Sequence, residues 1–312
     1  MNDLVLNIIL FSIGIFTLYY GADFLVRGGA NIARLLKIKP MVIGLTIVAF
    51  GTSMPEFLVG ISAVLKNEDA IAVGNIVGSN IANIALILGF SAIVSPILIR
   101  YKHIKNELLF LLISTIIFII FMINGVALYE GIIFLIIIFS YTVFLLRNPG
   151  THPVSEDMPE KDDSLLKNIF FVLLGFLGLV LGSNFLVDSA VFIARIFGVS
   201  EIVIGMSIVA VGTSLPELAA SAVASLKKQT DISIGNIIGS NIFNMFFVAG
   251  GISLIKPIPV DNKIFFFEIP VMFLYVLLLF PIILISGGIK RWQGILLLIS
   301  YFIFNIYLYY AR

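Results

Sequence analysis

Two six-residue stretches decide how this chain is built: GTSMPE at residues 51–56 and GTSLPE at residues 212–217. Each lies inside a long apolar segment and places a proline and a glutamate where an apolar helix would otherwise continue. The residues around them repeat as well, because MVIGLTIVAFGTSMPE at 41–56 aligns without gaps with IVIGMSIVAVGTSLPE at 202–217.

Further segments match at the same offset along the chain. GNIVGSNIAN at 74–83 aligns with GNIIGSNIFN at 235–244, and FLV at 24–26 matches FLV at 185–187. A constant offset across separate segments indicates an internal duplication rather than the chance similarity of apolar sequence. The two halves are therefore expected to share one architecture.

The composition predicts an all-α polytopic membrane protein. The chain has 312 residues, of which 60% are hydrophobic and 12% charged, and its mean hydropathy is +1.13; a soluble domain carries about twice that charged fraction. Apolar runs of about twenty residues recur, as transmembrane helices require, and they lack the alternation of a transmembrane β-barrel. The absence of cysteine excludes disulfides and thiolate metal sites. The first apolar segment has no small-residue cleavage site, so we expect a span rather than a signal peptide.

The hydropathy pattern predicts ten transmembrane helices. They cover about 4–26, 40–65, 70–96, 107–124, 127–146, 167–192, 201–226, 231–254, 266–286 and 292–310.

The one long connection divides the chain into a first five-helix repeat (1–146), a linker (147–166) and a second five-helix repeat (167–312). An odd number of spans in each half means that the second repeat enters the membrane inverted, which is the plan of many transporters with a central site. Of the 19 lysines and arginines, only five fall on one side of the membrane, namely Lys66, Arg195, Lys256, Lys263 and Arg312. The cation-rich side is expected to be cytoplasmic. The linker would then lie in the cytoplasm, and both termini would lie on the outer side of the cell membrane.

The repeated proline motif has a clear chemical consequence. Pro55 lacks an N–H and its ring clashes with the carbonyl of Gly51, and Pro216 does the same to Gly212, so each helix is expected to break and free backbone carbonyls. Irregular backbone inside a membrane is tolerated only where it is buried in protein or lines a cavity. Thr52 and Ser53 share a helix face with Glu56, three or four residues away. Carboxylate, hydroxyl and carbonyl oxygens without nitrogen or sulfur suit Ca²⁺, Mg²⁺, Mn²⁺ or Na⁺.

The second repeated motif has two readings. Asn75, Ser79 and Asn83 stand at four-residue spacing and form a polar stripe, which Asn236, Ser240 and Asn244 repeat. Small residues and single asparagines in membrane helices more often serve helix packing, and we assign that role to the pairs Asn75/Asn236 and Asn80/Asn241.

Glu56 and Glu217 resist a structural explanation. A charge at the bilayer centre costs about 2.5–3.5 kcal/mol, and no basic residue lies in a predicted membrane core to pair with either one. Other acidic residues are expected near span ends. Asp23, with Arg27, and Asp188 are expected to be solvated or to snorkel, and Glu107 and Glu268 to begin spans, where they would stabilise helix N-termini.

The motif pairs closely resemble the α-repeats of sodium/calcium exchangers, in the cation/calcium exchanger superfamily, and the resemblance covers nearly the whole chain. It implies Na⁺/Ca²⁺ antiport by alternating access, with the first and sixth spans sliding against the other eight. It also implies exchange of three Na⁺ for one Ca²⁺, with no cofactor, since the ions are the transported substrates. The implied ligands are the carboxylates of Glu56 and Glu217, the hydroxyls of Ser53, Ser214, Ser79 and Ser240, the carbonyls of Thr52, Thr213, Ala49 and Ala210, and the side chains of Asn83 and Asn244.

Two departures from the family refine the expectation. Potassium-dependent relatives carry an aspartate where this chain has Asn244, so potassium dependence and a third titrating carboxylate are not expected. Animal exchangers carry a large calcium-sensing domain in the central loop, whereas the linker here has about twenty residues. The chain looks like the minimal prokaryotic form, and nothing in it indicates a nucleic-acid partner or an obligate protein partner.

Three other functions fit parts of the pattern. A Ca²⁺/H⁺ antiporter, or an exchanger of another divalent cation for H⁺, would use the same fold, although proton-coupled relatives usually place an extra glutamate in the GN motif. An intramembrane serine enzyme would need a base beside a membrane-embedded serine. No histidine or lysine lies in the interior of a predicted span, so we do not expect an enzyme. A channel fits an inverted repeat with a closed central site less well than alternating access does.

Overall fold

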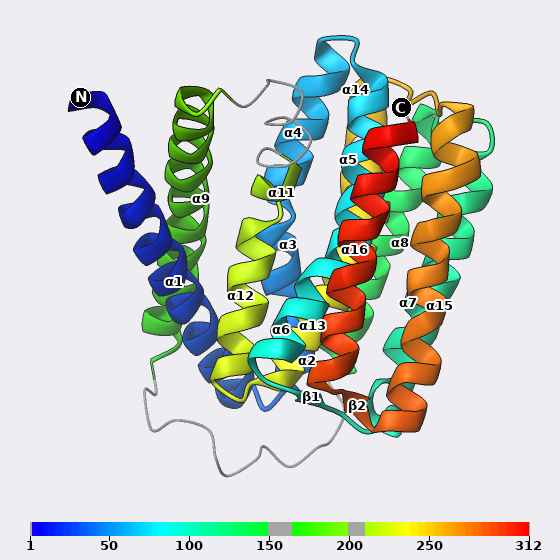
Figure 1. Cartoon of the computed structure of the whole chain (residues 1–312). Helices are drawn as coiled ribbons and strands as arrows, with labels where there is room; N and C mark the ends of the chain where they lie inside the picture. Colours follow the sequence, from blue (N-terminus) through cyan, green and yellow to red (C-terminus); the bar gives the residue numbers. More distant parts are fainter. Residues whose placement is uncertain (1, 149–163, 199–209, 312) are drawn as a thin grey trace.

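The computed structural model describes residues 2–148, 164–198 and 210–311, and these are nearly all helical (Figure 1). Within these ranges, nine helical segments are long and apolar enough to cross a membrane. They correspond to nine of the ten predicted spans. The remaining one, 201–226, is described only from Ala210, and most of the 147–166 linker lies outside the described residues.

Several of the membrane segments are composed of shorter helical pieces. In chain order the elements are α1 (Asn2–Leu35), α2 (Pro40–Ile43), η1 (Gly44–Val48), α3 (Ala49–Thr52), α4 (Met54–Leu65), α5 (Asp69–Ala82), η2 (Asn83–Leu88), α6 (Gly89–Val94), β1 (Ile97–Leu98), α7 (Tyr101–Met122), α8 (Leu128–Arg147), α9 (Leu165–Ile196), α11 (Ala210–Gly212), α12 (Leu215–Leu226), α13 (Thr230–Phe243), η4 (Asn244–Val248), α14 (Ala249–Ile255), η5 (Ile264–Glu268), α15 (Ile269–Ser286), β2 (Gly288–Ile289) and α16 (Arg291–Ala311).

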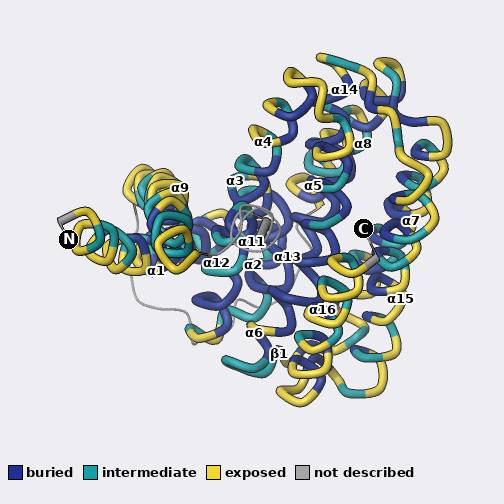
Figure 2. The backbone as a smooth tube through the Cα atoms, turned by 45° about the horizontal axis from the view of Figure 1, so that its top comes forward, coloured by how far each residue is buried: buried dark blue, intermediate teal, exposed yellow. Residues whose placement is uncertain are grey.

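The helices form a central bundle and a peripheral pair. In the membrane segment Thr230–Ile255, 89% of the most apolar stretch is buried, against 17% in α1. α9 is as buried as α8 and α16, at 28%, but it packs mainly along α1. Figures 1 and 2 show α1 and α9 side by side at one edge of the molecule, packed along each other and set apart from α7, α8 and α15. The centre of the bundle is therefore formed by the segments that carry the repeated motifs.

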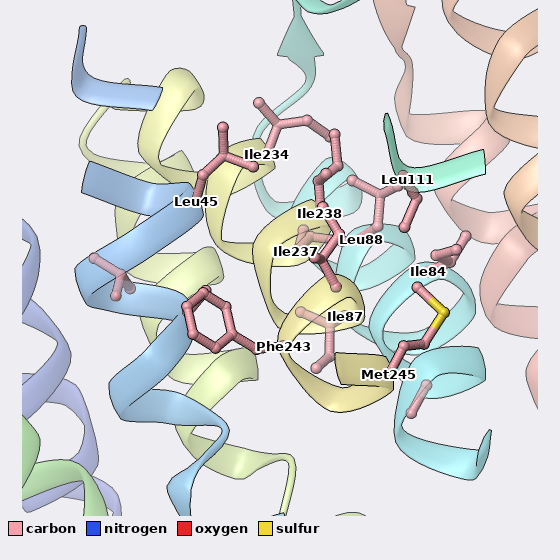
Figure 3. Close-up of a cluster of buried hydrophobic side chains, with 14 of the residues drawn as sticks. Leu45, Ile84, Ile87, Leu88, Leu111, Ile234, Ile237, Ile238, Phe243 and Met245 are labelled. Carbon is pink, nitrogen blue, oxygen red and sulfur yellow. The ribbon is translucent and has the colours of Figure 1, made fainter. Parts of the chain in front are cut away.

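Apolar side chains from four membrane segments fill this centre around α13 (Figure 3). Ile234, Ile237 and Ile238 of α13 meet Leu45 of η1 and Leu111 of α7, all of them buried. Burial of such side chains contributes nothing relative to lipid, so close packing rather than water exclusion holds the bundle together. The tight packing fixes the polar faces of the same helices against each other.

Corresponding elements of the two halves make reciprocal contacts. α6 packs against α16 and α14 packs against α8; likewise α5 packs against α15 and α13 packs against α7. The strands β1 and β2 pair with each other in antiparallel fashion. The described ends of the chain lie on one side of the bundle, and the end of α8 and the start of α9, which flank the linker, lie on the opposite side (Figure 1).

Three expectations about span ends differ from the structure. α1 continues to Leu35 rather than ending near residue 26, and α7 begins at Tyr101 rather than near 107, so Glu107 lies in the second turn of its helix. Glu268 is the last residue of η5 rather than the first of a span. Nothing in 27–35 breaks a helix, since its polar residues are compatible with helical backbone; the chain turns only at Lys37, where φ is +55°. Charge alone was therefore a poor guide to where these helices end.

Asp23 lies beside Arg27 as expected, but it is buried rather than solvated. Asp23 is only 5% exposed and forms ion pairs with Arg27, at 2.9 Å between Arg27 Nε and Asp23 Oδ2, and with Lys227 at the end of α12. The second partner comes from the other half of the chain, so its presence is invisible in the local sequence. Asp188, by contrast, is exposed as expected.

The Asp23–Lys227 ion pair should contribute to stability. Lys227→Met is expected to lower the thermal unfolding temperature in detergent, because removing one partner of a largely buried pair leaves a buried charge, at a cost of about 1–3 kcal/mol. Lys66 stands at the equivalent position of the first half and is exposed, so Lys66→Met is the matched control and should change the unfolding temperature little. Equal effects of the two substitutions would contradict this role for the pair.

Candidate ion-binding site

The helix breaks occur at the two proline motifs. In the first half, α3 ends at Thr52, Ser53 leaves helical geometry with φ −81° and ψ 1°, and α4 begins at Met54. In the second half, Ser214 has φ −90° and ψ 6° and α12 begins at Leu215. Each proline occupies the second position of the new helix, where its missing N–H has no helical partner to lose. Both breaks are thus placed where the sequence predicts them.

The carbonyls opposite the prolines have different surroundings in the two halves. The Gly212 carbonyl accepts a hydrogen bond of 2.8 Å from Ser183 Oγ of α9, so the protein itself satisfies it. The residue equivalent to Ser183 in the first half is Ala22, which has no hydroxyl. Gly51 instead faces the ring of Phe176, which leaves no room for a Cβ.

The two glutamates face each other across the breaks. Glu56 is 0% and Glu217 1% exposed. Ser214 Oγ donates to Glu56 Oε1 at 3.1 Å, and Ser53 Oγ donates to Glu217 Oε1 at 3.5 Å. Each serine thus serves the carboxylate of the other half. The Oε2 atom of each glutamate is buried without a hydrogen-bond partner, and neither carboxylate has a basic partner in the described part of the chain.

A second group of oxygens lies beside this pair. The Thr52 and Ser240 hydroxyl oxygens are 3.3 Å apart. Both approach Oδ1 of Asn236, at 3.2 Å from Thr52 Oγ1 and 3.5 Å from Ser240 Oγ. All three side chains are fully buried. Asn236, for which the sequence favoured a packing role, therefore hydrogen-bonds two of the predicted ligand residues.

The remaining predicted side chains come from the starts of the π-helical segments. Asn244 Nδ2 donates to Ser79 Oγ at 2.9 Å, which joins η4 to α5 across the two halves. Asn244 Oδ1 and both polar side-chain atoms of Asn83 are buried without a hydrogen-bond partner. Such π-helical segments often occur at functional sites, and here they begin at the matching asparagines.

The four predicted backbone ligands lie at the breaks, but they are not equivalent. The Ala49 carbonyl accepts from Ser53 N at 3.0 Å, and it lies 3.4 Å from Thr52 Oγ1, whose proton points to the nearer Asn236 Oδ1. In the second half Ser214 N bonds to Val211 O rather than to Ala210 O. Thr52 closes α3, and Thr213 occupies the turn after α11. The hydrogen bond before the break therefore spans four residues, as in an α-helix, in the first half and three residues in the second half.

These contacts describe a buried, oxygen-rich centre that contains two carboxyl groups. Buried polar atoms without partners are rare in folded proteins, yet Glu56, Glu217, Asn83 and Asn244 each contribute at least one here. Carboxylate and neutral oxygens are the ligands that Ca²⁺ and Na⁺ take. The described residues contain no group of three or more histidine, cysteine, aspartate or glutamate side chains, so the chemistry differs from that of zinc or di-iron sites.

Comparison with known proteins shows which family the chain belongs to. The family model described as "Sodium/calcium exchanger protein" matches residues 6–147 and 167–310. The chain belongs to the sodium/calcium exchanger family. It is a multi-pass membrane protein, and its family is one of transporters rather than of enzymes. Family membership therefore does not support the alternative of an intramembrane enzyme.

Individual relatives cover nearly the whole chain. The sodium/calcium exchanger MaX1 of Methanosarcina acetivorans is 32% identical over an alignment of 348 positions, which covers 98% of this chain and 99% of the relative. An uncharacterized membrane protein of Methanocaldococcus jannaschii is 36% identical over 304 residues, or 96% of this chain and 97% of that one. The structure of the sodium-calcium exchanger NCX_Mj soaked with 10 mM Na⁺ matches with a TM-score of 0.86 and 34% identity, over 99% of this chain and 100% of that chain.

Two participants in the site network were missed by sequence reasoning. Ser183 lies in α9 and Ser221 in α12, and they contact Gly212 O and Asn236 Nδ2. Ser221 follows Glu217 by four residues and therefore shares its helix face, a signal that was present in the sequence. Ser183 had no such signal, because only the tertiary packing of α9 brings it to the break.

Proposed function

We propose that this protein exchanges Na⁺ for Ca²⁺ across the cell membrane by alternating access, with three Na⁺ for each Ca²⁺. The observation that carries the proposal is the pair of buried carboxylates, Glu56 and Glu217, each hydrogen-bonded by a serine of the opposite half and neither balanced by a basic residue. The proposed ligands are Glu56, Glu217, Ser53, Ser214, Thr52, Thr213, Ser79, Ser240, Asn83, Asn244, Ala49 and Ala210.

Competition for one set of oxygens explains antiport. A Ca²⁺ ion neutralises both carboxylates, and leaving them uncompensated in the membrane interior is costly. Na⁺ ions neutralise the same carboxylates, and the hydroxyl and amide oxygens can hold a further Na⁺ without adding charge. Because neither ion can occupy the centre fully while the other is bound, loading one releases the other. Family membership and the Na⁺-soaked NCX_Mj structure support this assignment.

Ca²⁺/H⁺ antiport on the same fold is the second candidate. Two carboxylates can carry two protons in place of one Ca²⁺, which the geometry of the glutamate pair permits. Protons would bind the carboxylates alone and would leave the neutral oxygens of Thr52, Ser240 and Asn236 without a cation in the proton-loaded state. We favour Na⁺ because these buried oxygens can then coordinate a cation in both loaded states.

Alternating access requires a moving part, and the arrangement of helices supports one assignment. We assign residues 1–146 and 167–312 to two five-helix repeats of opposite orientation, which accounts for the reciprocal packing of α6 on α16 and α14 on α8. The pair of α1 and α9 is the part that would slide, since the two helices pack mainly on each other and touch the breaks through only a few residues.

The orientation is testable because the chain has no cysteine of its own. A single cysteine at Ser155 in the linker should react with a membrane-impermeant maleimide only after the cells are opened, because the positive-inside rule places the linker in the cytoplasm. A cysteine at Asn2, the first residue of α1, is the control and should react in intact cells. Labelling of the linker from outside would reverse the proposed topology.

A further inference from the structure

Two sequence-equivalent asparagines of the site have different partners. Asn75 is half-buried, and its Nδ2 donates to the backbone carbonyl of Glu56 at 2.9 Å. Asn236 is fully buried, and its Nδ2 donates to Ser221 Oγ at 2.9 Å. Its Oδ1 end therefore faces the hydroxyls of Thr52 and Ser240. The duplicated motif thus performs different tasks in the two halves.

The cause of the difference lies on the neighbouring helix. Ser221 follows Glu217 by four residues, and the residue that follows Glu56 by four is Gly60. Gly60 offers no hydroxyl, and the Ile252 side chain occupies the space where a Cβ would lie. An amide at position 75 has no anchor on that helix except the Glu56 carbonyl. One hydroxyl in α12 thus sets the direction of the Asn236 amide.

The direction of this amide matters for cation binding. A hydroxyl that coordinates a cation must point its proton elsewhere, and Oδ1 of Asn236 accepts the protons of both Thr52 and Ser240. Ser79, the equivalent of Ser240, differs because it donates to Ile76 O at 3.1 Å and accepts from Asn244 Nδ2 at 2.9 Å. One of its lone pairs is therefore already used.

We propose that Asn236, oriented by Ser221, is a positioning residue that aims the lone pairs of Thr52 and Ser240 at a Na⁺ ion, so that the two halves of the site differ in Na⁺ affinity. The inference rests on the proposed Na⁺/Ca²⁺ exchange. The oxygens of Thr52, Ser240 and Asn236 are all neutral. Neutral oxygens suit a monovalent ion better than Ca²⁺, since Ca²⁺ depends on the two carboxylates.

Removal of the Ser221 hydroxyl should weaken Na⁺ binding selectively. In Ser221→Ala the buried Nδ2 loses its acceptor, so the amide turns and donates to the Thr52 and Ser240 oxygens, which occupies the lone pairs that a cation needs. We expect the Na⁺ concentration for half-maximal Na⁺-driven Ca²⁺ flux to rise about 5–10-fold, the equivalent of one lost hydrogen bond. The Ca²⁺ concentration for half-maximal flux should change less than about twofold by the same reasoning.

Ser225→Ala is the matched control. Ser225 lies one helical turn further along α12, is fully buried, and bonds Ser233 of α13 at 2.9 Å across the same helix interface. It does not contact Asn236. Both substitutions should lower the ligand-free unfolding temperature by similar amounts, whereas only Ser221→Ala should lose Na⁺ affinity.

A second readout separates this inference from the proposed function. Na⁺-induced and Ca²⁺-induced thermal stabilisation of the purified protein requires no transport, and Ser221→Ala should shift only the Na⁺ titration. Ser221→Cys, which keeps the size of the side chain but offers only a weak acceptor, replaces the alanine variant if that one does not fold. Unchanged Na⁺ titrations in these variants, with a wild type that exchanges Na⁺ for Ca²⁺, would overturn the positioning role. A wild type that binds Na⁺ but does not exchange it would overturn the proposed function instead.

Discussion

Glu56→Gln and Glu217→Gln should each abolish Ca²⁺ transport in a protein that still folds and inserts. Each change removes one of the two negative charges while keeping the side-chain shape, and the loss of one partner from a buried charge pair costs about 3–5 kcal/mol, or about 100-fold or more in affinity. Ca²⁺ flux into proteoliposomes and Ca²⁺-induced thermal stabilisation measure the effect independently.

The controls for this prediction come from the chain itself. Glu68 is exposed at the start of α5, so Glu68→Gln should leave flux unchanged. The ion-free unfolding temperature of the two site variants should match or exceed that of the wild type, because an uncompensated buried charge has been removed. Near-normal Ca²⁺ exchange by either site variant would show that the central carboxylates do not hold the ion.

Exchange should also respond strongly to membrane potential. Two glutamates carry two negative charges, which one Ca²⁺ neutralises, and three Na⁺ in its place move one net charge in each cycle. One charge is worth about 2.3 kcal/mol per 100 mV, which corresponds to about a 50-fold change in the Ca²⁺ gradient that a given Na⁺ gradient can sustain. An inside-negative cell would therefore be helped to expel Ca²⁺.

The sign of the effect can be tested in Na⁺-loaded proteoliposomes. Ca²⁺ uptake in exchange for three internal Na⁺ removes one positive charge from the lumen, so an inside-positive potential set with potassium and valinomycin should raise uptake and an inside-negative one should lower it. The pair of asparagines Asn83 and Asn244 offers no third carboxylate whose proton release would cancel the extra charge. Uptake that is equal at both polarities would indicate exchange of two Na⁺ for one Ca²⁺.

The sequence predicted most of what local chemistry determines. The nine described spans follow from hydropathy, and the breaks at Ser53 and Ser214 follow from the geometry of Pro55 and Pro216. Both features depend on residues within one or two helical turns. The duplicated motifs also indicated which polar residues to expect near one another.

What the sequence missed depends on contacts between distant segments. The crossed pairing of Ser53 with Glu217 and of Ser214 with Glu56 exists only because the two breaks face each other. Asp23 is buried because Lys227 reaches it from the other half, and the Gly212 carbonyl is satisfied because α9 brings Ser183 beside it. The different roles of Asn75 and Asn236 follow from Gly60 and Ser221 on adjacent helices, which a comparison of the motifs alone does not contain.

The most direct test of the account compares two driving forces on the same proteoliposomes. We expect ⁴⁵Ca²⁺ to accumulate when internal Na⁺ flows out down its gradient, and to accumulate little when an outward proton gradient replaces the Na⁺ gradient at equal membrane potential. Accumulation driven by the pH gradient, with none driven by Na⁺, would contradict Na⁺/Ca²⁺ exchange and favour Ca²⁺/H⁺ antiport at the same pair of glutamates.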